Sequence, residues 1–220
     1  MRFEMASMVP NRFTLIRLLR EDRASTTFLG IDHVLERSNV LIKIFRKGHF
    51  SADRTKLVRL FSWFKGVRHP QLATSIDAGF TRKENLYYVR EYLPVSELPS
   101  GYETETIKRL AAVVLFLHSK GRVHGAIKPS NIFLSSGLLK LTDPKVDGVS
   151  SQGTEEHIRF SAPEVLEGSN ATFETDLYSV GAMLYRLLAA QDPFDDPELD
   201  HLKSKYLWAS PRPIIGFCNV

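Results

Sequence analysis

The sequence has little cysteine and no long hydrophobic run. Cys218 is the only cysteine in 220 residues, so no intrachain disulfide can form, and a reducing, cytoplasmic compartment is expected. The longest apolar run, residues 110–117, is too short to cross a bilayer, and the N-terminus has no signal-peptide core, so no membrane partner is expected. No basic run is interleaved with aromatic residues, so the net charge of +4 indicates a solvated surface rather than a nucleic-acid site.

The first half of the chain reads mainly as strands. β-branched and aromatic residues dominate five short runs, which polar breaks separate. The runs are residues 13–19, 26–31, 40–45, 72–80 and 86–92. Between the third and fourth runs, Ser51 is expected to cap a helix. Its apolar stripe follows the spacing of one helix face and consists of Leu57, Leu60, Phe61 and Phe64.

The second half reads mainly as helices. Residues 107–117 form an amphipathic pattern, and 176–188 is apolar on nearly every side, which predicts a helix buried all round. A polar loop is expected over 144–159 and a short helix over 201–208. The expected fold class is α+β and bilobal, with an antiparallel β-sheet lobe over 11–93 and a mostly helical lobe over 94–220.

Six short motifs follow one another in order over residues 13 to about 210. The central one, His124 to Asn131 followed by Asp143, is similar to the catalytic loop and magnesium strand of protein kinase domains. Val40-Leu41-Ile42-Lys43 resembles the strand whose lysine pairs with the α/β-phosphates, and residues 87–92 resemble the strand that enters the hinge. The other three are Ser161-Ala162-Pro163-Glu164, the stretch from Asp176 to Gly181, and Asp192-Pro193-Phe194.

The resemblance implies a set of nucleotide and metal ligands. It assigns ATP contacts to Lys43, Glu91, Lys128, Asn131 and Asp143, and magnesium contacts to Asn131 and Asp143. In the catalytic loop, His124 and Lys128 stand where the family has the same two residue types.

Several positions depart from the family pattern in ways that oppose catalysis. Ala126 stands where the loop has its catalytic aspartate, so no catalytic residue is assigned, and loss of a general base costs about 10²–10⁴-fold in rate. Leu60 stands where the lysine's glutamate partner is expected, and Pro144 and Lys145 replace the Phe-Gly after the metal-binding aspartate. Arg20, Asp22 and Ser25 replace the three glycines of the phosphate loop.

The pocket expected for adenine is narrowed by larger side chains. Leu41 replaces the usual alanine of the roof, Phe133 the leucine of the floor, and Arg90 occupies the normally apolar gatekeeper position. ATP and Mg²⁺ binding is therefore expected to be weak or absent.

These departures predict a pseudokinase that acts as a signalling or regulatory interaction module with protein partners. Residues 149–159 and the helix surface around Trp63 are candidate contact sites. An active atypical Ser/Thr protein kinase, transferring the γ-phosphate of ATP to protein hydroxyls, is the alternative. A small-molecule phosphotransferase is a third reading, because His124-Gly125 is similar to the H-G-D of antibiotic kinases.

The C-terminal lobe is expected to be incomplete. The family continues through more helices after the region of Phe194, and an arginine there pairs with the residue equivalent to Glu164. Three explanations stay open: the chain is a fragment of a larger multidomain signalling protein, another chain completes the lobe, or the fold is only marginally stable.

Overall fold

The structure is a computed structural model that describes residues 9–50, 53–94, 103–135, 137–146 and 154–214. The chain divides into two compact units. The first comprises residues 1–94 and 146–150, and the second comprises 95–145 and 151–220. Each unit is considered by itself.

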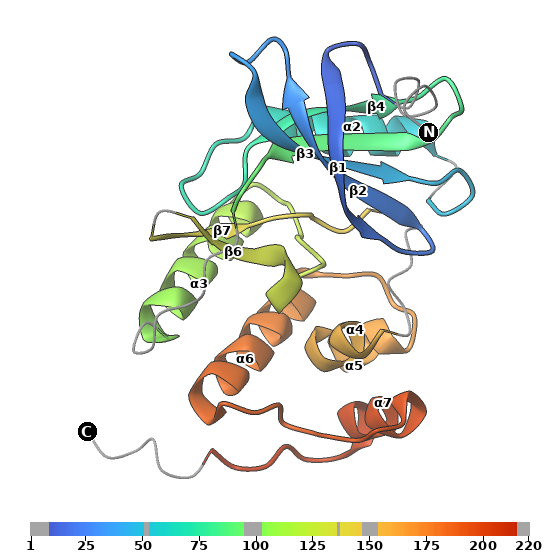
Figure 1. The fold of residues 1–220 in the computed structure, drawn as a ribbon. Helices are drawn as coiled ribbons and strands as arrows, with labels where there is room; N and C mark the ends of the chain where they lie inside the picture. Colours follow the sequence, from blue (N-terminus) through green and yellow to red (C-terminus); the bar gives the residue numbers. More distant parts are fainter. Residues whose placement is uncertain (1–8, 51–52, 95–102, 136, 147–153, 215–220) are drawn as a thin grey trace. The chain divides into compact units, whose positions relative to one another are not determined.

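The first unit is built on an antiparallel five-stranded sheet with the order β1-β2-β3-β5-β4 (Figure 1). Runs of β-branched and aromatic residues form the strands, as expected. The fourth strand starts at Ser75 rather than at residue 72, and the fifth ends at Glu91 rather than at residue 92. The strands are β1 (Phe13–Glu21), β2 (Ser25–Asp32), β3 (Ser38–Phe45), β4 (Ser75–Phe80) and β5 (Leu86–Glu91).

The sheet has an apolar cluster on each face. Alternate residues of a strand point to opposite faces, and directly paired residues of antiparallel strands share a face. Val40, Ile42 and Val89 are fully buried in the cluster on one face. Phe45, Leu86, Tyr88 and Val146 belong to the other cluster, together with residues from the one helix in the described part of this unit.

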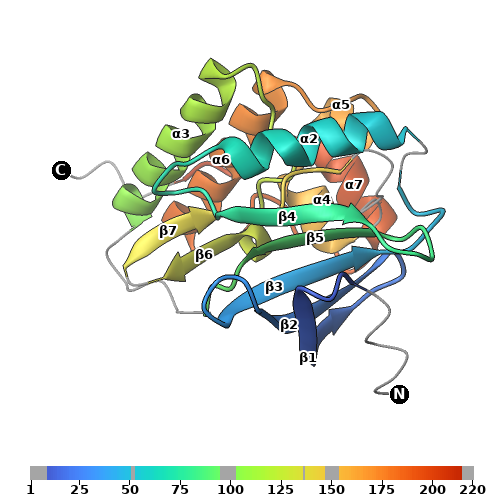
Figure 2. The same cartoon turned by 90° about the horizontal axis from the view of Figure 1, so that it is seen from above.

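That helix, α2 (Arg54–Gly66), lies along β4 (Figure 2). Leu57, Phe61 and Phe64 are its buried residues, and the rings of Phe61 and Tyr88 lie 4.9 Å apart. The prediction of Ser51 as the cap is wrong. The helix begins later, and the carboxylate of Asp53 accepts a hydrogen bond from the Lys56 N–H, which satisfies a free donor of the first turn.

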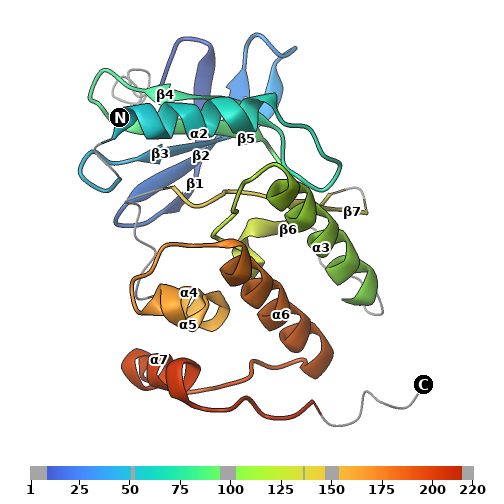
Figure 3. The ribbon, with the colours of Figure 1, turned by 180° about the vertical axis from the view of Figure 1, so that it is seen from behind.

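The second unit is mostly helical, with one small hairpin. In this unit α3 lies beside α6, and α7 lies beside α4 and α5 (Figure 3). The elements are α3 (Glu103–Ser119), a 3₁₀ turn (Pro129–Asn131), β6 (Ile132–Ser135), β7 (Leu138–Leu141), α4 (Glu155–Phe160), α5 (Pro163–Leu166), α6 (Phe173–Ala189) and α7 (Leu199–Trp208). Together with the antiparallel sheet of the first unit, they confirm the predicted α+β fold class.

The expectation that residues 176–188 are buried on all sides is wrong. Within α6 only Thr175, Asp176, Ser179 and Met183 are buried, and Leu177 is 53% exposed. Among the described residues α6 packs against α3 and α4, so part of its surface meets no neighbouring element. An apolar sequence specifies that a helix can be buried, but the neighbours decide which faces are covered.

No helix in the described ranges is both long enough and apolar enough to span a membrane.

Candidate functional site

A buried carboxylate at the start of α6 holds the turn that carries the central motif. Asp176 accepts hydrogen bonds from the backbone N–H groups of His124, at 2.7 Å, and Gly125, at 2.8 Å. A third bond, of 2.9 Å, joins it to Nε2 of His118 on α3. Gly125 has a φ of +68°, and an added Cβ would lie 3.0 Å from Cβ of Lys145, so the tight turn favours glycine here.

His124 is 1% exposed and stays neutral, because burial lowers its pKa. Its Nδ1 accepts a hydrogen bond from the Ala126 N–H at 3.3 Å, so the ring proton is on Nε2, which donates to the Thr142 carbonyl at 3.1 Å. The two hydrogen bonds of the ring therefore connect the loop to Thr142, the residue before Asp143.

Ala126 lies at the position of the expected base, and its polar backbone groups are both used. Its N–H donates to His124, and its carbonyl oxygen accepts from Nδ2 of Asn131 at 2.8 Å. The side chain is a methyl group, which can neither accept a proton nor orient a hydroxyl. The loop geometry is thus formed without its proton acceptor.

The two expected magnesium ligands lie side by side. Nδ2 of Asn131 also approaches the Asp143 carbonyl oxygen at 3.4 Å, which leaves the amide oxygen Oδ1 as the group available to a cation. Asp143 has a left-handed backbone with a φ of +52°. Among the described residues no group of three or more His, Cys, Asp and Glu side chains is placed to hold a metal. A cation here would depend on these two residues and on oxygens from outside the protein.

Lys128 is engaged by an acidic residue that the sequence motifs do not include. Its Nζ lies 3.0 Å from Oε2 of Glu156 on α4. The same carboxylate accepts the Ser130 N–H at 2.8 Å and the Ser130 hydroxyl at 2.7 Å. Burial opposes ionisation of Glu156, but these bonds from Ser130 and Lys128 outweigh it and lower the pKa of the carboxyl. Glu156 is therefore a bound anion in contact with the expected phosphate-binding lysine.

In the first unit, the turn between β1 and β2 is closed by its own carboxylate. Asp22 accepts hydrogen bonds from the N–H groups of Ala24, at 2.9 Å, and Ser25, at 2.7 Å, and from the Ser25 hydroxyl, at 3.0 Å. Arg46 donates to the carbonyl oxygens of Asp22 and Arg23 at 2.6 and 2.8 Å. Two of the three residues that replace glycines are thus bonded to each other, and the N–H groups of Ala24 and Ser25 already have an acceptor.

Lys43 lies on β3, directly opposite Tyr88 of β5, and its Nζ is 5.3 Å from the centre of the Phe45 ring. Helix α2 has no acidic residue between Arg54 and Gly66, and Leu60 is only partly buried. Helix α2 therefore cannot supply the glutamate that pairs with this lysine in the family pattern. Lys43 is nevertheless near Asp22, since its charge contributes to lowering the pKa of that carboxyl, although burial acts in the opposite direction and is the largest influence.

The arginine at the expected gatekeeper position is buried. Arg90 is 1% exposed and pairs with Leu41 across β3 and β5, so the two larger side chains share one face of the sheet. Nη1 of Arg90 donates to the carbonyl oxygen of Glu91 at 3.0 Å. The Glu91 carboxylate accepts the Thr74 N–H at 2.7 Å. Glu91, expected to contact nucleotide, therefore has both its carbonyl and its carboxylate in use.

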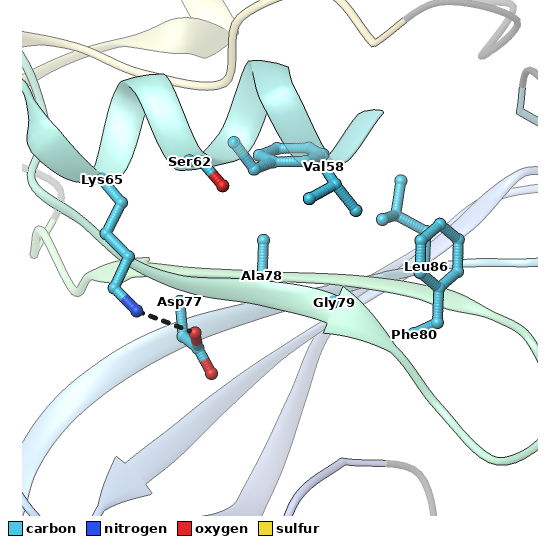
Figure 4. Close-up of a pocket in the computed structure, with 9 residues that line it drawn as sticks. Val58, Ser62, Lys65, Asp77, Ala78, Gly79, Phe80 and Leu86 are labelled. Carbon is cyan, nitrogen blue, oxygen red and sulfur yellow. Dashed lines mark hydrogen bonds and ion pairs between the residues drawn. The ribbon is translucent and has the colours of Figure 1, made fainter. Parts of the chain in front are cut away.

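A hollow in the first unit lies between α2 and β4 (Figure 4), and none of the site residues described above lines it. Val58, Ala78 and Leu86 are among its apolar lining residues, and the ion pair of Lys65 with Asp77, at 3.3 Å, lies at one end. The neighbouring Trp63 packs edge-on against Phe64. Nothing in the hollow connects it to phosphoryl chemistry.

Comparison with known proteins agrees with this geometry. The family described as "Protein kinase domain" matches residues 24–209 of the chain. The chain belongs to the protein kinase domain family. It is 26% identical to serine/threonine-protein kinase pkn2 of Myxococcus xanthus over 94% of this chain, and 25% identical to serine/threonine-protein kinase PrkC of Bacillus subtilis over 91%. It is 30% identical to CBL-interacting protein kinase 9 of Oryza sativa over 90%. The chain spans 28%, 34% and 46% of these three relatives.

Within this kinase domain, the segment before the Ala-Pro-Glu motif is anchored by an arginine. Arg159 of α4 lies 3.1 Å from Asp192 and 3.0 Å from Asp195, and it donates to the Phe194 carbonyl at 2.7 Å. Glu164 of the motif is exposed and makes no ion pair with any residue in the described ranges. The segment is therefore fixed through Arg159 rather than through Glu164.

Sequence reasoning missed three contacts at the kinase motifs. It did not identify Glu156 or Arg159, and it did not identify Asp22 as the acceptor that closes the turn between β1 and β2. The prediction of a polar loop over 144–159 is wrong at its end, where Thr154 caps a helix with Glu155 and Glu156 in its first turn, and residues 147–153 lie outside the described residues. The sequence Thr154-Glu155-Glu156 is a helix-start signal that would have indicated α4, although not which group its glutamates contact.

Proposed function

We propose that this kinase domain is a pseudokinase that works as a regulatory interaction module, with impaired or absent phosphoryl transfer. The observation that carries the proposal is Ala126. The loop around it is fully ordered by Asp176, His124 and Asn131, so the loss of the aspartate is not a sign of a disrupted fold. A scaffold that is kept while the proton acceptor is lost favours a binding role over a catalytic one.

The groups that should meet nucleotide support the same proposal. The turn N–H groups bind Asp22, the Glu91 carbonyl binds Arg90, and Lys128 binds Glu156. Magnesium and ATP would supply the cation and the phosphoryl group of the family reaction. Asn131 and Asp143 could supply part of the ligand set of the cation. The groups that would bind the phosphates and the adenine base fit them poorly, because each of these groups is already bonded to another residue of the chain.

Two measurements on the purified chain test the proposal. The first is thermal stability with and without millimolar ATP and Mg²⁺, since a ligand at a hundred times its Kd adds about 2.7 kcal/mol to stability. The second is phosphate incorporation into a generic protein substrate. We expect little or no magnesium-dependent stabilisation and no transfer above that of Lys43→Ala. Transfer by the wild-type chain that disappears in Lys43→Ala would overturn the proposal.

An active atypical Ser/Thr protein kinase is the second candidate. The adjacency of Asn131 and Asp143 favours it, because a metal site would be retained. Nucleotide-dependent stabilisation that is lost in Asp143→Ala, together with transfer to protein hydroxyls, would support this candidate.

Protein partners are the expected targets of a pseudokinase module, and no membrane or nucleic-acid partner is proposed. The surface around Trp63 stays a candidate contact site, as does the described part of residues 149–159, which begins at Thr154. A cytoplasmic location is proposed as well, because the single cysteine of the chain fits a reducing compartment.

A further inference from the structure

A single side chain of α4, that of Glu156, makes several polar contacts with the catalytic loop. Glu156 receives three donors: the ammonium group of Lys128, the N–H of Ser130 and the hydroxyl of Ser130. The side chains of Lys128 and Glu156 are 19% and 29% exposed, so the pair is shielded from most solvent. A cation, a backbone N–H and a hydroxyl that converge on two oxygens form the kind of site that binds a phosphoryl or carboxylate group.

We propose that Lys128 and Ser130 form an oxyanion site that Glu156 occupies from within the chain, and that a phosphoryl group can enter only when Glu156 is displaced. Glu156 thus acts as a latch between α4 and the catalytic loop. The inference concerns the regulation of the loop described under the proposed function and rests on it, because Lys128 is taken as the phosphate-facing lysine.

The latch is held by the placement of α4 and not by the carboxylate alone. The Thr154 hydroxyl caps the helix by accepting the His157 N–H at 3.2 Å. Arg159 ties its last turn to Asp192 and Asp195. The Ser179 hydroxyl of α6 donates to the Phe160 carbonyl at 2.7 Å. Since the last turn of the helix is fixed to neighbouring segments, Glu156 meets Lys128 at the high effective concentration of an intramolecular partner.

Charge explains why the latch excludes a phosphoryl group. With Glu156 in place, Lys128 is neutralised, and an entering phosphate meets a carboxylate of like charge. Glutamine at position 156 keeps the shape and an acceptor for Ser130, but it removes the negative charge. The Glu156→Gln variant should therefore leave α4 in place while weakening its competition with an added anion.

The test is the affinity of the full chain for inorganic pyrophosphate, measured by titration calorimetry at low salt. Glu167→Gln is the matched control, because it removes the same charge from an exposed glutamate of the same unit. We expect Glu156→Gln to bind pyrophosphate at least about tenfold more tightly than the wild type and the control. The gain should disappear in the double variant Glu156→Gln/Lys128→Met.

Affinity in Glu156→Gln that equals that of Glu167→Gln, or a gain that persists without Lys128, would overturn the proposal. If Glu156→Gln does not fold, amide hydrogen exchange of the wild type decides, because the Ser130 N–H should exchange slowly while it donates to Glu156. Rapid exchange at Ser130 in the folded chain would also refute the latch. Neither readout involves phosphate transfer, so failure here is distinct from failure of the pseudokinase proposal.

Discussion

Substitution of Asp176 by asparagine should destabilise the second unit strongly. Three donors point at its two carboxylate oxygens: the N–H groups of His124 and Gly125, and Nε2 of His118. Asparagine offers one oxygen and one NH₂ group. In the better orientation its oxygen faces His118 and His124, and the NH₂ group is set against the Gly125 N–H. One buried donor then loses its acceptor, and the other two lose a charged one.

The size of the effect follows from these three contacts. An unsatisfied buried donor costs about 1–3 kcal/mol, and a hydrogen bond to a neutral group is weaker than one to a charged group by about 1 kcal/mol. The sum for Asp176→Asn is about 3–5 kcal/mol, since Asp176 is 1% exposed and solvent cannot replace the lost bonds. Asp200→Asn, an exposed change on α7, should stay within about 0.5 kcal/mol.

Urea unfolding gives the free energies of unfolding, and hydrogen exchange of residues 122–131 shows where the loss occurs. The expected result for Asp176→Asn is a lower urea midpoint together with faster exchange at His124 and Gly125. A loss below about 1 kcal/mol, with exchange at these amides unchanged, would refute the reasoning, because it would mean that the carboxylate does not hold the loop.

Three further predictions concern the first unit. Asp32→Asn removes the paired bonds from Arg12, of 2.8 and 2.6 Å, and should cost about 2–3 kcal/mol by urea unfolding. Burial acts to raise the pKa of Asp32, but the hydrogen bonds from Arg12, Val34 and Leu35 outweigh it and lower the pKa. This contribution should therefore be present at neutral pH and be lost in acid, as pH falls through the lowered pKa. An acid titration of stability that is the same in wild type and variant would contradict this. Gly30→Ala places a Cβ 2.5 Å from Cδ1 of Ile42 and should cost about 1–3 kcal/mol, seen as a lower Tm. Phe61→Ala empties a site in the cluster between α2 and the sheet and should cost about 3–5 kcal/mol, and an unchanged Tm would show that this packing is dispensable.

The α+β fold class could be predicted because local sequence patterns indicate its main strands and helices. The runs of β-branched and aromatic residues in β2 and β3, and the stripe of Leu57, Phe61 and Phe64 on α2, depend on residue type and spacing alone. Element ends were less certain, since Ser51 and Asp53 are both good cap residues and only the start of the helix selects between them. The exposed side of α6 was not predictable, because it depends on which elements pack beside the helix.

At the candidate site, the motifs predicted which residues belong together but not which are already bonded. The proximity of Asn131 to Asp143 followed from the resemblance. The pairing of Lys128 with Glu156 did not, since it joins residues 28 positions apart through a helix that was read as loop. Likewise, the sequence shows that Arg90 is larger than the residue usual at its position. Its hydrogen bond to the Glu91 carbonyl depends on the conformation of the side chain, which the sequence does not give.

The same contacts predict that restoring the base alone will not restore activity. An aspartate at position 126 would supply the proton acceptor, which is worth about 10²–10⁴-fold in rate. Lys128 would still be paired with Glu156, and Asp22 and Arg90 would still occupy groups assigned to nucleotide. Each of these contacts is intramolecular, so a ligand must displace a partner that is always present. Ala126→Asp should therefore show no phosphate transfer above the wild type in a radiolabel assay, and addition of Glu156→Gln should be needed before any transfer is seen. Transfer by Ala126→Asp alone would mean that the internal contacts yield readily to nucleotide, and that the missing aspartate is the sole barrier to catalysis.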